Sequence, residues 1–214
     1  LDAVWFSSTA DADRFGKDVP GRVVPNGIDS ERYAGPDRRP RVDRWAVLGR
    51  VVPHKGVADL LAALRRQRDP VSELDVLGPI DEADRRWLHR ASEGLQTRIR
   101  VWGARSVRFV AERLALAAWA VFPSRYEGFG LAALEAMAAA VPVIVADVPA
   151  LRDAVAHGGG RLVDFRDPDH AAGALDAIRD LGPAMVIGEQ ARVSARRADW
   201  AVRVDGFLEA YEAA

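Results

Sequence analysis

Short apolar, β-branched runs alternate with amphipathic helical patterns through the middle of this 214-residue chain. The runs that read as strands cover residues 45–48, 74–77, 99–102, 120–122 and 143–145, with a further strand over 161–163 after a glycine loop at 158–160. Apolar residues at helical spacing predict helices over 56–66, 84–92, 107–117 and 131–139. Strands that alternate with helices form parallel sheets covered on both faces, and strands this apolar fit such burial. We therefore expect an α/β fold with a Rossmann-like, doubly wound parallel sheet.

Both ends of the chain fall outside this alternation. Residues 1–34 contain strand-like runs at 3–6 and 22–24 around a polar helix start at Ser8, which is too little to form a core. The Pro- and Arg-rich stretch 35–41 is expected to be a linker. Residues 198–214 predict an amphipathic helix that packs back toward the N-terminal segment, with an apolar stripe of Trp200, Val204, Phe207, Leu208 and Tyr211. The expected division is thus 1–34, 35–197 and 198–214.

Composition argues against several classes of function. Lys and Arg total 30 against 31 Asp and Glu, so the chain lacks the positive charge typical of proteins that bind nucleic acid or anionic membranes. It has no cysteine, which excludes disulfides, thiolate metal sites and a cysteine nucleophile and is compatible with a reducing cytoplasm. No apolar run approaches the ~20 residues of a membrane span, and the N-terminus lacks a secretory pattern. We expect a cytoplasmic protein that acts on small molecules.

Candidate anion-binding residues follow the predicted strands, where parallel sheets bind their ligands. Gly49 and Arg50 come directly after the first strand, and Lys55 stands at the start of the next helix. A guanidinium, an ammonium and free backbone N–H groups would converge there, which suits a diphosphate. On this spacing alone, two solvated basic residues near a loop remain the simpler explanation.

The segment 123–131, Pro-Ser-Arg-Tyr-Glu-Gly-Phe-Gly-Leu, is a stronger signal because two carboxylates, Glu127 and Glu135, lie on either side of its glycine-rich turn, which opens a helix. Gly128 and Gly130 would let the backbone approach a ligand, and the positive end of the helix would face it. Glu135 lies in an otherwise apolar helix, where an unpaired carboxylate is costly. Vicinal ribose hydroxyls are a natural partner for it, and exposure on the outer helix face is the alternative. The arrangement predicts a sugar-nucleotide site.

Taken in order, these motifs resemble the carboxyl-terminal, donor-binding half of a GT-B glycosyltransferase of the retaining family 4 type. The matching residues are Val24-Pro25-Asn26-Gly27-Ile28-Asp29, Gly49-Arg50, Lys55-Gly56, Pro123-Ser124, Glu127-Gly128-Phe129-Gly130, Glu135-Ala136-Met137-Ala138 and Pro142-Val143. The resemblance runs nearly from end to end of the chain. It implies that the sheet is the C-terminal half of a GT-B fold and that residues 1–34 are the tail of an N-terminal acceptor domain and its crossover.

The resemblance also implies a role for each site residue. Arg50 and Lys55 would hold the diphosphate of a UDP-, GDP- or ADP-hexose, Glu127 would bind hydroxyls of the hexose, and Glu135 the ribose. The base would lie near residues 101–103. The implied catalytic residues are Arg50, Lys55 and Glu127, and the implied donor-binding residues are Gly49, Gly78, Trp102, Gly103, Ser124, Gly128, Phe129, Gly130, Leu131 and Glu135. The hexosyl group would pass to an acceptor hydroxyl with retention at the anomeric carbon, without a metal or other cofactor.

The acceptor site would belong to the N-terminal domain, so we expect this chain to bind a donor but to transfer little sugar by itself. Peripheral contact with the inner membrane face would fall to that other domain. Two alternatives are a nucleotide-binding module without transfer activity and another GT-B activity, such as a sugar-nucleotide epimerase or a phosphorylase. The complete set of Arg50, Lys55, Glu127 and Glu135 favours the transferase. The Asp-x-Asp pairs at 11–13 and 167–169 look like helix features, and the four histidines lack metal-ligand spacing.

Overall fold

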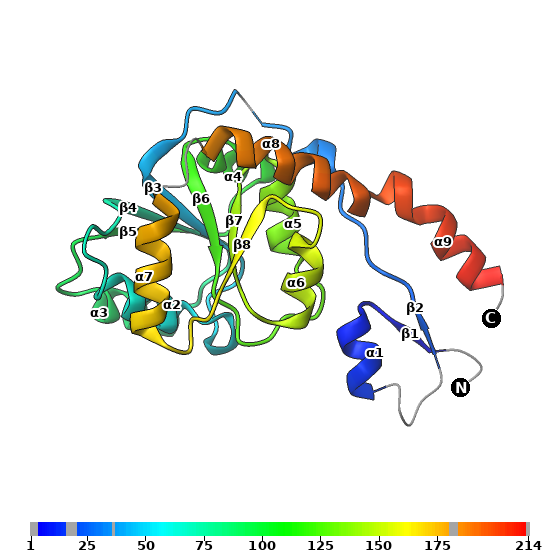
Figure 1. Cartoon of the computed structure of the whole chain (residues 1–214), viewed down its shortest axis with the longest axis horizontal. Coiled ribbons are helices and arrows are strands. Elements are labelled where there is room, and N and C mark those ends of the chain that lie inside the picture. Colours follow the sequence, from blue (N-terminus) through cyan, green and yellow to red (C-terminus); the bar gives the residue numbers. More distant parts are fainter. Residues whose placement is uncertain (1–3, 16–20, 36, 180–183, 213–214) are drawn as a thin grey trace.

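A computed structural model describes residues 4–15, 21–35, 37–179 and 184–212 of the chain. Its centre is a six-stranded sheet in the order β5-β4-β3-β6-β7-β8, in which every neighbouring pair is parallel (Figure 1). The strands are β3 (Arg41–Leu48), β4 (Glu73–Leu77), β5 (Arg98–Gly103), β6 (Ala117–Phe122), β7 (Val143–Ala146) and β8 (Gly160–Val163). This confirms the predicted doubly wound α/β sheet.

The helices cover both faces of the sheet, as right-handed crossovers require. On one face lie α2 (Val57–Leu64) and α3 (Glu82–Ala91), with α7 (Pro168–Arg179) packed against α2. On the other lie α4 (Val107–Leu114), α5 (Leu131–Ala138) and α6 (Pro149–Val155), with α8 (Ala184–Ala195) packed against α5. The direction of winding reverses between β3 and β6. In such sheets ligands bind beyond the carboxyl ends of the strands at this switch point.

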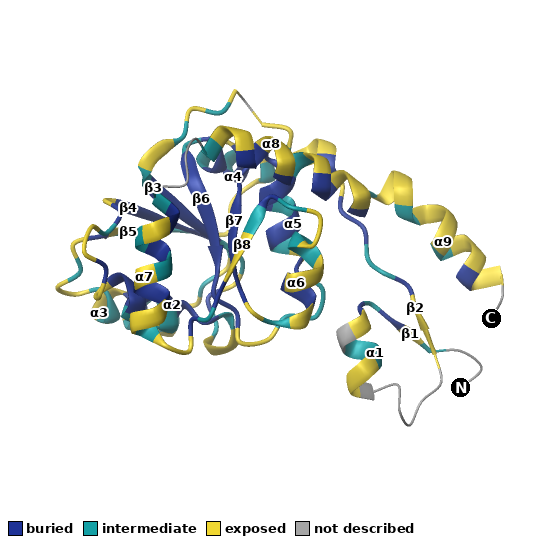
Figure 2. Cartoon of the chain, viewed as in Figure 1, coloured by how far each residue is buried: buried dark blue, intermediate teal, exposed yellow. Residues whose placement is uncertain are grey.

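The core lies between these layers. All residues of β4, β6 and β7 are buried, and Figure 2 shows the central strands as the most deeply buried part of the fold. Trp45, Leu74 and Ile144 are fully enclosed. Because these strands are covered on both sides, their apolar residues revealed them in the sequence, although β4 also carries the buried carboxylates of Glu73 and Asp75.

Several element boundaries differ from the sequence prediction. β3 begins at Arg41, which was assigned to the linker 35–41, and β6 begins at Ala117, which was assigned to the preceding helix. The two extensions are one feature, since Arg41 and Ala117 are paired across the two strands. The start of β3 is polar and partly exposed, so apolar patterning could not reveal it. β8 likewise begins at Gly160, a residue assigned to the preceding loop.

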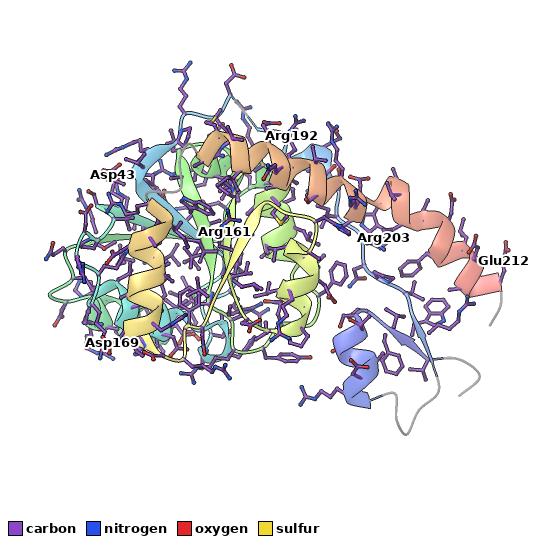
Figure 3. All side chains as sticks on the ribbon, in the orientation of Figure 1. Asp43, Arg161, Asp169, Arg192, Arg203 and Glu212 are labelled. Atoms are coloured by element: carbon purple, nitrogen blue, oxygen red, sulfur yellow. The ribbon has the colours of Figure 1, made fainter. Side chains whose placement is uncertain are left out.

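The ends of the chain come together beside the sheet. Near the N-terminus, β1 (Trp5–Phe6) and β2 (Arg22–Val23) form a parallel pair next to α1 (Thr9–Phe15), and a short 3-10 helix, η1 (Ser30–Tyr33), then crosses to the sheet. After another, η3 (Arg196–Ala198), α9 (Trp200–Glu212) reaches back toward β1, and Figure 3 labels Arg203 and Glu212 along it. The ring of Phe207 lies 5.8 Å from that of Trp5 and 5.6 Å from that of Trp200.

Hydrogen bonds fix the crossing of these two segments. The backbone N–H of Ile28 donates to Ala198 at 2.8 Å, and the N–H of Trp200 donates to Ile28 at 2.9 Å. Asp199 accepts from the backbone N–H of Ser30 at 2.9 Å and from its hydroxyl at 2.5 Å, which holds the pKa of Asp199 below its usual value. These bonds fix the crossover segment, residues 28–30, to the start of α9 at the point where η1 begins.

Candidate functional site

Glycines mark the carboxyl ends of the three neighbouring strands β3, β4 and β5. The N–H of Gly49 donates to Leu77 at 2.8 Å, and the N–H of Gly78 donates to Gly103 at 3.1 Å. Gly78 has a φ of 140°, and a Cβ there would overlap the carbonyl oxygen of Gly49. The strand ends can lie this close because side chains are absent, which leaves this part of the sheet edge as bare backbone.

The loop that carries Lys55 is pressed against the loop that follows β6. Lys55 ends a 3-10 helix, η2 (Pro53–Lys55), and Gly56 then begins α2 with a φ of 68°. A Cβ on Gly56 would overlap the carbonyl oxygen of Pro123. The N–H of Arg125 also donates to the carbonyl of His54 at 2.8 Å. These contacts join two segments far apart in the sequence at the switch point between β3 and β6.

Three predicted site residues meet at this junction. The Nζ of Lys55 lies 2.6 Å from Oε2 of Glu127, and the Ser124 hydroxyl donates to the same oxygen at 3.3 Å. The side chains of Lys55 and Glu127 are 24% and 15% exposed, and Ser124 is buried. The site therefore contains a partly desolvated cation and anion that contact each other directly.

Arg125, which was not among the predicted site residues, supports the same junction. Its guanidinium makes two hydrogen bonds to the carboxylate of Asp59 on α2, at 2.7 and 2.8 Å. A fork-to-fork geometry of this kind fixes orientation as well as charge. Sequence reasoning passed over Arg125 because an arginine in a polar turn carries no pattern that names its distant partner.

The segment after Glu127 presents open backbone. An added Cβ on Gly128 would meet no atom within 4 Å, and Leu131 is exposed at the start of α5. Gly130 precedes α5 with a φ of 86°, and Phe129 packs against the core. The N–H groups at the start of α5 carry its positive end, so this turn offers both space and charge for an anion.

Arg50 follows Gly49 at the end of β3. It is exposed, and within the part of the chain that the structure describes it forms no ion pair. Its charge is therefore available to a ligand, unlike that of Lys55. Arg50 and Lys55 thus differ in ion pairing, although they are only five residues apart in the sequence.

Glu135 lies on α5 with its side chain half-buried. Burial raises its pKa above the usual value, an effect opposed by a hydrogen bond from Tyr33 and by the charge of Arg32. Burial, together with the negative charge of Glu135 and the hydrogen bond to it, raises the pKa of Tyr33. Tyr33 belongs to η1, in the crossover from the N-terminal segment. It was missed from sequence because no local spacing connects a tyrosine in the crossover to a glutamate on α5.

Trp102 lies in a buried charge network below α4. Its indole N–H donates to Asp75 at 2.8 Å, and the guanidinium of Arg113 lies 4.7 Å from the centre of its ring. Asp75 is fully buried and forms a 2.9 Å ion pair with Arg113. Arg44 also approaches Asp75, and it pairs with Glu73. The indole N–H of Trp102 therefore already has a protein partner, and donor contact by Trp102 stays a prediction.

The described residues contain no group of three or more His, Asp or Glu side chains placed to hold a metal ion. Within the predicted Asp-x-Asp pairs, Asp11 accepts from the hydroxyls of Ser7 and Tyr126, and Asp167 accepts from backbone N–H groups at the start of α7. Among the helices in the described ranges, none has the length and apolar character needed to cross a membrane.

Solved structures share the fold of the whole chain. Sucrose-phosphate synthase from Thermosynechococcus elongatus matches all of this chain and 59% of its own, with a TM-score of 0.82 and 25% identity. HepE from Anabaena, in complex with UDP and glucose, matches all of this chain and 64% of its own, with a TM-score of 0.83 and 21% identity. The fold is thus that of one half of a GT-B glycosyltransferase.

Sequence comparison gives the family. Residues 42–193 match the glycosyl transferases group 1 family. A GDP-mannose:cellobiosyl-diphosphopolyprenol alpha-mannosyltransferase of Xanthomonas campestris is 32% identical over 97% of this chain and 57% of its own length. A D-inositol 3-phosphate glycosyltransferase of Geodermatophilus obscurus is 35% identical over 94% of this chain and 49% of its own. The chain belongs to the glycosyl transferases group 1 family, and it spans about half the length of these relatives.

Proposed function

We propose that this chain is the nucleotide-sugar-binding half of a retaining hexosyltransferase. The observation that carries the proposal is the convergence of Lys55, Ser124 and Glu127 at the switch point of the sheet, where Lys55 and Glu127 lie 2.6 Å apart. A cation for phosphate and a carboxylate for sugar hydroxyls are the two groups that a sugar diphosphate needs at the bond that breaks. Doubly wound sheets bind nucleotides at this place.

The remaining predicted residues extend this site in both directions. Arg50 and Lys55 would stabilise the negative charge that develops on the departing diphosphate, which is the principal electrostatic task of this half. The backbone from Gly128 to Leu131 and the start of α5 would contact sugar and phosphate. Glu135 would bind the ribose, and the base would lie against residues 101–103. We propose that no metal takes part.

The acceptor would bind to a second domain, so this half alone would bind the donor and transfer little sugar. Residues 1–34 would be the tail of that domain, residues 35–197 the donor-binding domain and residues 198–214 the returning helix. Two similar proteins are a GDP-mannose:cellobiosyl-diphosphopolyprenol alpha-mannosyltransferase and HepE, solved in complex with UDP and glucose, which makes a nucleotide hexose the first class of donor to try. The cysteine-free sequence accords with a cytoplasmic location.

The test is calorimetric titration of the chain with UDP, GDP and ADP. We expect one of them to bind more tightly than about 1 mM and Arg50→Ala to weaken it by about 10-fold, the loss of one charge-assisted phosphate contact. Arg161→Ala is the matched control, because Arg161 is exposed on β8 and its guanidinium donates to the adjacent carbonyl of Gly160. If no diphosphate binds below millimolar concentration, the proposal fails.

A separate assay tests the division of labour between the two halves. The chain is incubated with UDP-glucose, GDP-mannose and ADP-glucose together with sugar and polyprenyl-phosphate acceptors. We expect no transfer above the rate of spontaneous donor hydrolysis. Transfer to a defined acceptor by this chain would contradict the assignment of the acceptor site to another domain, while leaving the donor site intact.

A further inference from the structure

The cation and the anion at the centre of the site form an ion pair with each other. Oε2 of Glu127 lies 2.6 Å from Nζ of Lys55 and also accepts from the Ser124 hydroxyl. Both side chains of the pair are largely withdrawn from water, at 24% and 15% exposure. Solvent screening of their mutual attraction is therefore weaker than for a surface pair.

The backbone around the pair leaves few ways to separate it. The loops that carry Lys55 and Glu127 are held by the bond from the Arg125 N–H to His54 and by the close approach of Gly56 to Pro123. The two hydrogen bonds between Arg125 and Asp59 add a third link. Rotation of the Lys55 side chain away from Glu127 would bring it to a phosphate without movement of either loop.

We propose that Glu127 competes with phosphate for Lys55 and so makes the site select a nucleotide sugar over the sugar-free nucleoside diphosphate. This inference rests on the proposed function. When a hexose is present, its hydroxyls replace the ammonium as donors to Glu127, and Lys55 is released to the diphosphate. When the hexose is absent, the diphosphate must break the ion pair and then lie near an uncompensated carboxylate.

Competition for Lys55 predicts an unusual effect of replacing Glu127 on the affinity for a sugar-free diphosphate. Replacing a residue that only binds hexose would leave the affinity for a sugar-free diphosphate unchanged. Replacing a competitor for Lys55 should instead strengthen it, because the like charge is removed and Lys55 becomes free. The same mechanism would speed release of the nucleoside diphosphate after transfer, since the ion pair re-forms once the hexose has gone.

The experiment compares the wild-type chain with Glu127→Gln, which keeps the shape of the side chain and removes its charge. The probes are inorganic pyrophosphate, the nucleoside diphosphate that binds among UDP, GDP and ADP, and the matching UDP-glucose, GDP-mannose or ADP-glucose. Glu112→Gln serves as the control, because it neutralises a carboxylate paired with Arg108 at 3.0 Å on α4, away from the junction. Thermal unfolding verifies that each variant is folded.

We expect Glu127→Gln to bind pyrophosphate and the diphosphate about 3- to 10-fold more tightly, and the nucleotide sugar no more tightly than the wild type. In a Lys55→Met background the gain from Glu127→Gln should shrink to less than about 2-fold, because the competition has been removed. Glu112→Gln should change none of these affinities.

The two hypotheses fail in different ways. If the wild-type chain binds neither pyrophosphate nor any diphosphate, the proposed function fails and this inference falls with it. If the wild type binds a diphosphate but Glu127→Gln binds it equally or more weakly, the competition is refuted and the donor site stands. Should Glu127→Gln fail to fold, Glu127→Ala is measured under the same criteria, and an undiminished gain in the Lys55→Met background likewise refutes the competition.

Discussion

Replacing Gly56 with alanine tests whether the contact between the two loops positions the site. Gly56 has a φ of 68°, in the left-handed region, where an L-residue is less stable by about 1–2 kcal/mol. Reduced freedom of the unfolded chain offsets about 0.4–1 kcal/mol of this. The new Cβ would also overlap the carbonyl oxygen of Pro123, and relieving such overpacking costs about 1–3 kcal/mol. The expected loss in free energy of unfolding is therefore about 2–4 kcal/mol.

Gly94 provides a matched control for the backbone term. Its φ is 74°, close to that of Gly56, but a Cβ added there would meet no atom within 4 Å. Gly94→Ala should lose only about 1 kcal/mol, from left-handed strain less the unfolded-state gain. Urea denaturation at 25 °C measures both variants, and the difference between them isolates the overlap with Pro123.

The same pair of variants separates stability from function. Relief of the overlap must move the Lys55 loop away from the Pro123 loop, so Gly56→Ala should also weaken nucleoside diphosphate binding by about 10-fold, while Gly94→Ala leaves it unchanged. Equal stability of the two variants would refute the overlap. A destabilised Gly56→Ala that still binds the diphosphate with wild-type affinity would show that loop contact does not position Lys55.

Two further substitutions test buried charges. Asp75→Asn should lower stability by about 3–5 kcal/mol, because Arg113 and Arg44 lose a fully buried counter-charge, and a drop in melting temperature below about 3 °C would contradict this. Burial raises the pKa of Glu135, so its ionised form weakens the fold increasingly as pH rises from its unfolded pKa of about 4.3 through the higher folded value. Without nucleotide, Glu135→Gln should therefore stabilise the chain more at pH 7 than at pH 4 in thermal scans, and an equal effect at both pH values would refute the argument.

The strands of the sheet could be predicted because their burial follows from their composition. β6 and β7 are enclosed on both faces, so a continuous apolar run and a buried strand are the same signal there, whereas β4 is recognised by its three apolar residues beside the buried Glu73 and Asp75. The extensions of β3 and β6 could not be predicted in this way. The start of β3 is polar and is ordered by backbone pairing, such as that of Arg41 with Ala117. The start of β6 is apolar, and Ala117 also continues the apolar pattern of the preceding helix.

Which residues of the site gather at the switch point could be predicted in part, but not how they interact. Residues after parallel strands meet at one edge, and this rule places Gly49, Gly78 and Gly103 side by side. The resemblance to a known family supplied roles for Lys55 and Glu127 but no relation between them. Their ion pair depends on how two loops pack against each other, although β4 and β5 lie between those loops in the sequence. Contacts such as that of Gly56 with Pro123 set this packing.

The pairing of Tyr33, in the crossover, with Glu135 could not be predicted from local sequence either. Tyr33 reaches Glu135 because η1 is held beside α5, and η1 is held there by bonds between Ile28, Ser30 and the start of α9. Glu135, which is expected to bind ribose, is therefore paired with Tyr33. The position of Tyr33 depends in turn on the contacts between the crossover and the start of α9. A change in how the terminal helix meets the crossover would therefore be expected to alter the pairing of Glu135 with Tyr33, and with it the pKa of Glu135, without touching α5.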